Sequence, residues 1–289
     1  MNHKNLSRLL DDALNIEAEE AKAAGALGYM ARVLVQATMP HKSTPGTEFQ
    51  RSNGIYTLTV LSPSVVGLPF GAYPRLLLAW LTSEAVKTKS PSLVLGPTLS
   101  GFMNELGLLP TGGRWGTIGR LRDQMRRLFS SSISCTVSAE KEDAGMGFMV
   151  ASKYRLWWDP KLPEQAALWN STVTLSKDFF EEIIDRPVPI DMRALRALKK
   201  SPLSLDIYCW LTYRMSYLGK RTEIPWEALQ AQFGAGYPQT PEGTRNFKRK
   251  YLQQLRAVQL LYPRAKVEEG THGLVLKPSR THIPKLPSP

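Results

Sequence analysis

Residues 112–129, GGRWGTIGRLRDQMRRLF, carry five arginines against a single aspartate. The planar guanidinium of arginine offers a rigid fork of donors, which suits the paired acceptors of a phosphate group or of a guanine edge. Stepping 100° per residue gathers the apolar side chains on one side of a helix and the arginines on the other. The apolar positions are Ile118, Leu121, Met125, Leu128 and Phe129. The stretch therefore predicts a helix that packs by one face and offers a cationic face to a polyanion.

A second helix of the same design is expected over residues 240–261, TPEGTRNFKRKYLQQLRAVQLL. The positions of its predicted buried stripe are Phe247, Tyr251, Leu255 and Val258. Arg245, Arg249 and Arg256 fall close together opposite this stripe. A single charged helix face is usually only solvated, but two equivalent helices with this arrangement favour DNA contact.

The polar side chains of these two helices are the candidate DNA contacts. The expected base readers lie near the start of the second helix and are Arg245, Asn246 and Arg249, because arginine pairs with guanine and asparagine with adenine in the major groove. The corresponding residues of the first helix are Arg114, Thr117 and Arg120. The other candidates, which could contact bases or phosphates, are Lys248, Gln253, Arg256, Arg122, Arg126, Arg127, Lys277 and Arg280. The last two follow a predicted hairpin and could equally belong to a solvated tail.

The charge of the whole chain agrees with an anionic partner. Its 37 Lys and Arg residues exceed its 25 Asp and Glu residues, which gives a net charge of +12 and an isoelectric point near 9.7. Double-stranded DNA is expected rather than a membrane, since no apolar run approaches the roughly 20 residues that span a bilayer. The N-terminus is too acidic for a signal peptide, and Cys135 and Cys209 lie in apolar stretches as buried thiols do. A cytoplasmic protein is therefore predicted.

The chain reads as two copies of one module. The first gives a helix at 73–89, an extended piece, a helix at 98–107 capped by Thr98 and ended by Gly107, the arginine-rich helix, and a hairpin from 132 to 158. The second gives the same order with a helix at 201–219, the piece TEIP, a helix at 226–234, the helix at 240–261, and a hairpin around Gly270. The triplet Trp-Leu-Thr occurs at 80–82 and again at 210–212. Three helices followed by a hairpin are typical of a winged helix.

The predicted fold class is therefore α+β, with two tandem winged-helix domains and an N-terminal amphipathic helix. The expected boundaries are 1–50 for the N-terminal helix and a loop, 51–165 and 166–280 for the two domains, and 281–289 for a Pro-rich tail. The helix over 5–24 could pack on its own domain or bind a partner, and 38–54 reads as a loop. The strand expected at 54–62 could pair within its domain or with a second copy.

The sequence lacks recognisable catalytic motifs. The pair Gly219-Lys220 lacks the remainder of a phosphate-binding loop, and the four histidines are scattered without the spacing that gathers a metal. No serine has the context of a nucleophile elbow. The sequence predicts a protein that is not an enzyme, with no catalytic residues, no metal and no cofactor.

Four motifs resemble one known family. They are LVQATMPHK at 34–42, GLPFGAYPRLLLAWLTSEAVKTKSPSLVLG at 67–96, the arginine-rich stretch at 112–129, and PLSLDIYCWLTYRMS at 202–216. Together they are similar to the RepA family of bacterial plasmid replication initiators. The resemblance implies binding to iterons, which are direct repeats at the plasmid origin, and opening of that origin. It also implies host partners such as the replicative helicase or the host initiator, association with the plasmid or nucleoid, and copy-number control through a monomer–dimer equilibrium.

Two other functions fit parts of the pattern. A transcriptional repressor could use the same two modules without any role in replication. A nicking protein of the rolling-circle type would attack DNA with a tyrosine, but the scattered histidines offer no metal site for that reaction.

Overall fold

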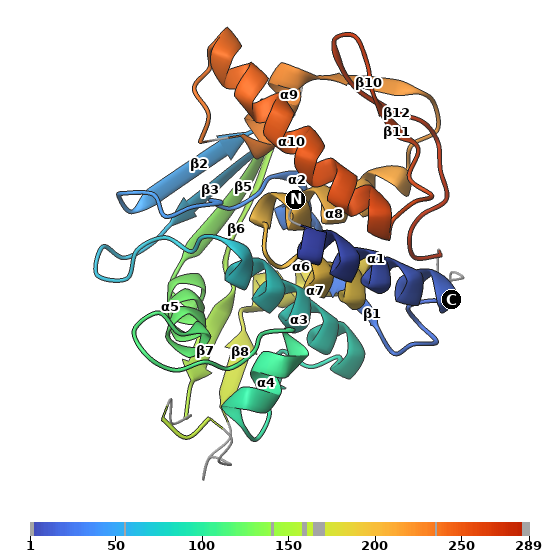
Figure 1. Cartoon of the computed structure of the whole chain (residues 1–289). Helices are drawn as coiled ribbons and strands as arrows, with labels where there is room; N and C mark the ends of the chain where they lie inside the picture. Colours follow the sequence, from blue (N-terminus) through green and yellow to red (C-terminus); the bar gives the residue numbers. More distant parts are fainter. Residues whose placement is uncertain are drawn as a thin grey trace.

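The chain folds into two units with the same order of elements, as seen in the computed structural model of Figure 1. The structure describes residues 3–54, 56–139, 142–157, 161–163, 171–234 and 236–284. The elements of the first unit are α1 (His3–Ala18), β1 (Leu27–Met30), α2 (Arg32–Gln36), α3 (Ala72–Thr88), β4 (Ser92–Val94), α4 (Leu99–Glu105), α5 (Thr117–Phe129), β7 (Ala151–Arg155) and β8 (Thr172–Leu175). The elements of the second unit are α6 (Lys177–Asp185), β9 (Val188–Asp191), α7 (Met192–Leu198), α8 (Pro202–Met215), β10 (Thr222–Pro225), α9 (Trp226–Phe233), α10 (Pro241–Leu261), β11 (Val267–Glu269) and β12 (Gly273–Leu276).

The sheets repeat along with the helices. The first unit has a three-stranded sheet in the order β4-β8-β7, and the second has one in the matching order β10-β12-β11. The equivalent strands β1 and β9 pair antiparallel with each other, with Leu27 opposite Asp191, and so join the two units. The predicted repeat is confirmed in element order, and it extends further toward the N-terminus than the sequence indicated. The fold is mixed α+β, as predicted.

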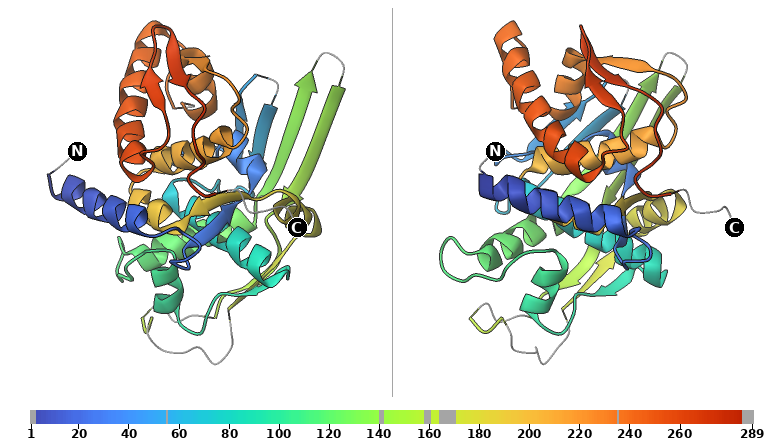
Figure 2. Two further views of the ribbon diagram at one scale, coloured as in Figure 1. Left: turned by 90° about the vertical axis from the view of Figure 1, so that its right-hand side faces the viewer. Right: turned by 45° about the vertical axis from the view of Figure 1, so that its right-hand side comes forward.

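Four strands without counterparts in the second unit form a separate sheet. These strands are β2 (Glu48–Ser52), β3 (Tyr56–Leu61), β5 (Ser132–Ala139) and β6 (Glu142–Met149), in the order β2-β3-β5-β6. Figure 2 shows β5 and β6 as two long strands that stand beside the second unit. The first unit is therefore the same module as the second with two hairpins inserted.

Two sequence predictions need correction in this region, and one open alternative is decided. The predicted loop at 38–54 contains β2, in which Phe49 and Arg51 are buried and alternate with exposed neighbours. The predicted hairpin from 132 to 158 breaks at Val150, which is fully buried, so that β6 pairs with β5 while β7 pairs with β8. Of the two alternatives left open for the strand at 54–62, pairing within its own domain is the one found, because β3 has β2 on one side and β5 on the other.

A buried ionic cluster joins α3 of the first unit to α8 of the second. Arg75 of α3 donates two hydrogen bonds to the carboxylate of Asp206 of α8, from Nε at 2.6 Å and from Nη2 at 2.8 Å. His41 Nε2 lies 2.6 Å from the same carboxylate. Burial alone would raise the pKa of Asp206, but Arg75 and His41 hold it at about 2. Trp80 and Trp210 occupy equivalent buried positions on the same two helices. The two units thus share one continuous core.

The two ends of the chain pack against the second unit. Helix α1 ends at Ala18 and contacts α7 and α10 of the second unit, so it packs within the chain but not on its own unit, and Leu6, Leu10 and Leu14 remain exposed. The C-terminal segment returns to the core, because the ring of His282 stacks on Tyr262 with centroids 4.7 Å apart. Residues 285–289 of the predicted Pro-rich tail lie outside the described residues.

Candidate nucleic-acid interface

The start of α10 is held in place by hydrogen bonds from α9 and from the connecting turn. Thr240 caps the helix, since its hydroxyl accepts a hydrogen bond from the amide of Gly243 at 3.1 Å. The buried amide of Gln230 donates to the Pro238 carbonyl at 2.9 Å and accepts from the Thr244 hydroxyl at 2.6 Å. A Cβ on Gly243 would come within 2.0 Å of the Pro238 carbonyl oxygen, so glycine is required at this close approach. The connection between α9 and α10 therefore fixes where the helix begins.

One face of α10 packs and the opposite face is open. The predicted stripe of Phe247, Tyr251, Leu255 and Val258 is buried, as expected. Phe247 and Tyr251 lie with ring centroids 5.5 Å apart, and Tyr251 lies 5.6 Å from Phe233 of α9. These ring contacts set the rotation of α10, and its polar side chains consequently face outward.

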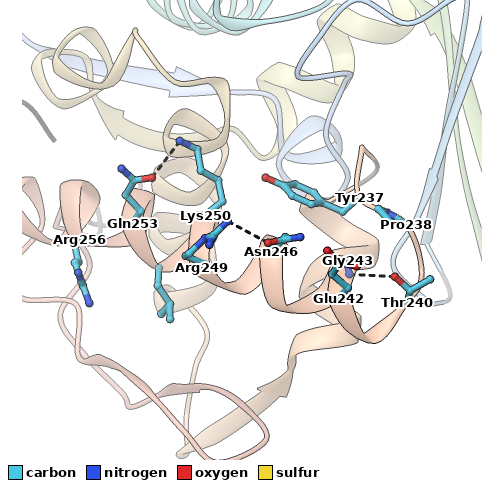
Figure 3. Close-up of a pocket in the computed structure, with 11 residues that line it drawn as sticks. Tyr237, Pro238, Thr240, Glu242, Gly243, Asn246, Arg249, Lys250, Gln253 and Arg256 are labelled. Carbon is cyan, nitrogen blue, oxygen red and sulfur yellow. Dashed lines mark hydrogen bonds between the residues drawn. The ribbon is translucent and has the colours of Figure 1, made fainter.

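The open face of α10 borders a groove of about 940 Å³, shown in Figure 3. The residues lining it are Tyr237, Pro238, Thr240, Glu242, Gly243, Asn246, Arg249, Lys250, Leu252, Gln253 and Arg256. Four of the predicted contact residues, Asn246, Arg249, Gln253 and Arg256, are thus brought together in one groove. Arg245 is exposed but does not line it.

The cations of this face are available to an outside acceptor. Arg249 Nη2 donates to Asn246 Oδ1 at 3.1 Å, and Lys250 Nζ donates to Gln253 Oε1 at 3.2 Å, so both pair with neutral amides (Figure 3). Among the described residues, no carboxylate lies within 4.0 Å of the charged groups of Arg245, Arg249, Lys250 or Arg256. Hydrogen bonds to neutral amides can be exchanged for charge-assisted bonds to a phosphate or a base at little cost.

Lys250 belongs to this groove although the sequence prediction omitted it. It lies four residues after Asn246 and three before Gln253, and residues at these spacings are neighbours on a helix surface. The three form one row along the groove. The spacing from Asn246 was the signal that could have found Lys250.

The cations near the β11–β12 hairpin are neutralised within the chain. Lys248 Nζ lies 2.7 Å from Glu269 and stands over the Trp226 ring, while Lys277 Nζ lies 2.7 Å from Glu268. Arg280 is exposed, and its carbonyl accepts a hydrogen bond from Tyr262 Oη at 2.7 Å. The expected contacts of Lys248 and Lys277 with DNA would therefore have to compete with these ion pairs.

Helix α5 presents a smaller set of available cations than its sequence suggested. Its five predicted apolar positions are all buried. Arg114, Arg122 and Arg126 are exposed, and none of the three has a carboxylate within 4.0 Å among the described residues. Arg114 stands over the ring of Trp115, a side chain that is 79% exposed.

Three other predicted contacts of the first helix are engaged by their own chain. Arg127 forms an ion pair with Asp123 at 2.7 Å and stands over the Phe70 ring. Arg120 folds back so that Nη2 donates to the Trp115 carbonyl at 2.7 Å. The Thr117 hydroxyl donates to the Leu109 carbonyl at 2.5 Å and closes the loop that precedes α5. These side chains shape the start and the flank of α5.

The arrangement of elements is shared with known crystal structures. RctB domains 2-3 match with a TM-score of 0.50 and 13% identity, over 85% of this chain and 96% of that one. Selenomethionine derivatives of domain 2 and domain 3 of RctB match with a TM-score of 0.52 and 14% identity, over 84% of this chain and 94% of that one. At these identities the comparison shows a common fold.

The family follows from the sequence of the same region. Residues 68–228, more than half of the chain, match the model of the plasmid encoded RepA proteins, and the chain belongs to that family. The family resemblance is thereby confirmed; of the four motifs, the one at 34–42 lies outside the matched residues. The comparison with curated proteins finds no match.

The described residues also bear on membrane insertion and on metal binding. Within the described parts of the chain, no helix is long and apolar enough to cross a membrane. No group of three or more His, Cys, Asp or Glu side chains could hold a metal ion there.

Proposed function

We propose that this RepA-family protein is a plasmid replication initiator that binds direct repeats of its origin DNA through two winged-helix modules. The observation that carries the proposal is the groove along α10, where Asn246, Arg249 and Arg256 lie together with no acidic partner for either arginine among the described residues. A recognition helix with this surface fits a major groove, where arginine reads guanine and asparagine reads adenine. The second unit is the main reader in this proposal.

The winged-helix assignment rests on element order and sheet order. In each unit three helices, α3 to α5 or α8 to α10, precede a hairpin. The second strand of that hairpin pairs with the short strand before the second of those helices, β8 with β4 and β12 with β10. In both units the cationic helix, α5 or α10, is the last of these three helices, which is the position of the recognition helix in such modules. We take α5 to contact phosphates through Arg122 and Arg126, because these available arginines lie beyond its tightly bonded start.

The remaining parts of the proposal come from the family resemblance. They are opening of the origin with host replication proteins, control of copy number by a monomer–dimer equilibrium, and the absence of an enzymatic step. A transcriptional repressor is the second candidate, since the groove on α10 would serve it equally.

A plasmid-maintenance experiment separates these two candidates. A plasmid that carries the repeats beside this gene, but not the gene itself, is introduced into cells that supply the protein from the chromosome. Retention only in cells that supply the protein is expected, with loss of retention for Arg249→Ala. A plasmid that persists without the protein, while a reporter next to the repeats is still repressed, would favour the repressor.

A further inference from the structure

A second cavity lies beside the α10 groove and is lined by α1, α10, β2 with the segment before it, and the junction of α7 with α8. Its volume is about 660 Å³, which falls in the range of about 300–1,000 Å³ typical of small-molecule sites. Tyr237, Lys250 and Gln253 line both this cavity and the groove, so the two are neighbours.

The wall of the cavity carries positive charge only. Its cationic residues are Arg8, Lys42, Arg51, Lys200 and Lys250. Among the described residues that line it there is no aspartate or glutamate. Arg8 has a carboxylate within 4.0 Å, that of Asp12, and the described chain offers none within that distance to the other four. An anion would therefore meet uncompensated charge from several sides.

The lack of a nearby carboxylate matters most for Arg51, because its side chain is only 3% exposed. Its Nη1 donates to Thr38 Oγ1 at 2.7 Å and to the Gln232 carbonyl at 2.6 Å, but its Nε has no partner among the described residues. Burial lowers the pKa of Arg51 to about 10. A buried cation without a counter-charge is costly, and a bound anion would relieve that cost.

The carboxylate whose charge acts on Arg51 is that of Asp206, and it is already engaged by two other side chains. Asp206 receives two hydrogen bonds from Arg75 and lies 2.6 Å from His41 Nε2. In the buried ionic cluster a single carboxylate thus contacts Arg75 and His41 directly and acts on Arg51 only through its charge. A second unpartnered polar atom, the Thr44 hydroxyl, belongs to the same cavity wall.

The rest of the wall is apolar and partly aromatic. Leu9, Phe49, Leu203, Phe233 and Ala257 are all buried side chains that line the cavity. Such a surface has little to offer to a bare inorganic ion, but it packs well against a ring. Its volume also exceeds what a single phosphate would fill.

We propose that this cavity binds a small organic anion with an aromatic body, whose anionic group neutralises Arg51 and Lys42 and whose ring packs against Phe49, Leu203 and Phe233. The site adjoins the α10 groove and shares Tyr237, Lys250 and Gln253 with it, and its occupancy can be measured in the absence of DNA.

The test uses the full chain without DNA and the aromatic sulfonate 8-anilinonaphthalene-1-sulfonate as a fluorescent probe. Saturable binding of one probe per chain is expected. Lys42→Glu should weaken it about tenfold or more, because a charge-assisted contact to the anion becomes a repulsion. The matched control is Lys177→Glu on α6, an exposed lysine that does not line the cavity, and this variant should leave the dissociation constant unchanged.

Competition and a second variant complete the test. Adenosine 5′-monophosphate should displace the probe, while inorganic phosphate at the same concentration should not. Arg51→Gln should abolish displacement by the nucleotide, and urea unfolding of that variant checks that it is folded. The proposal is overturned by unsaturable binding, by equal affinity of the Lys42→Glu protein and the wild type, or by displacement with inorganic phosphate alone.

Discussion

Helices α5 and α10 occupy the same place in the two units, and their sequences look equally basic, yet their cations are used differently. On α10 the guanidinium of Arg249 pairs only with a neutral amide and faces a groove. On α5 the guanidiniums of Arg120 and Arg127 are bonded to their own chain. The difference teaches that a cationic helix face must be divided into charges that are free to meet DNA and charges that hold the helix in place.

The largest expected effect comes from removing the buried ion pair of Arg75 with Asp206, which joins the two units that the comparison sets side by side. Asp206→Asn would leave Arg75 buried without a counter-charge, and we expect the free energy of unfolding to fall by about 3–5 kcal/mol. Urea denaturation measures the loss. The control is Asp123→Asn in the half-exposed pair with Arg127, where a loss of about 1 kcal/mol or less is expected. Similar losses in the two variants would mean that the buried cluster does not join the units.

The next effect concerns base reading by the second unit. Arg249→Ala should relax the preference at one base position by about 1–3 kcal/mol, because a bidentate contact to guanine is lost. Competition binding with duplexes substituted at single positions would locate that base. Lys177→Ala serves as the control for a change of charge elsewhere on the surface. An unaltered preference at every position would exclude Arg249 as a base reader.

A smaller effect is expected from the available arginines of the first unit. Arg122→Ala and Arg126→Ala should each weaken binding to all sequences alike, and each should reduce the slope of log affinity against log salt by about one. Arg127→Ala is the matched control on the same helix, since its guanidinium is engaged by Asp123 and Phe70. If Arg127→Ala changed the slope as much as the other two, the division between free and engaged cations would be wrong.

The smallest effect is the pH dependence of the C-terminal segment. Burial lowers the pKa of His282 to about 4, whereas an unfolded histidine titrates near 6.5. Between about pH 6.5 and pH 4 the unfolded chain binds the extra proton, so the stabilisation from the docked ring is lost as the pH falls. The melting temperature of the wild type should therefore drop more from pH 7.5 to pH 5 than that of His282→Phe. Equal drops would show that the ring has the same pKa in the folded and the unfolded chain, so that its burial does not link stability to pH.

Much of the helical framework could be predicted from the sequence, because periodic apolar positions decide which face of a helix packs. The stripe of α10 and the cap of α4 by Thr98 are both found where the pattern placed them. The inserted sheet was harder, since β2 is short and lies within polar turn residues. Its pairing with β3 is a contact that no local pattern encodes.

The candidate site was predictable to the level of a face but not of single side chains. Whether an arginine is free depends on partners elsewhere in the chain, such as Phe70 beneath Arg127. The ion pairs of Lys248 with Glu269 and of Lys277 with Glu268 likewise join α10, and the residue that follows β12, to β11. Only the folded chain brings these charges together.

The most direct test of the account compares the two helices in one measurement. Fluorescence anisotropy at about 0.15 M salt gives the affinity for the repeats beside the gene and for a shuffled duplex, and specific binders typically favour their site by about 10³ or more. We predict such a ratio for the wild type, a reduced ratio for Arg249→Ala, and an unchanged ratio with weaker overall binding for Arg126→Ala. Equal binding of both duplexes by the wild type, or a ratio that falls for Arg126→Ala and not for Arg249→Ala, would contradict it.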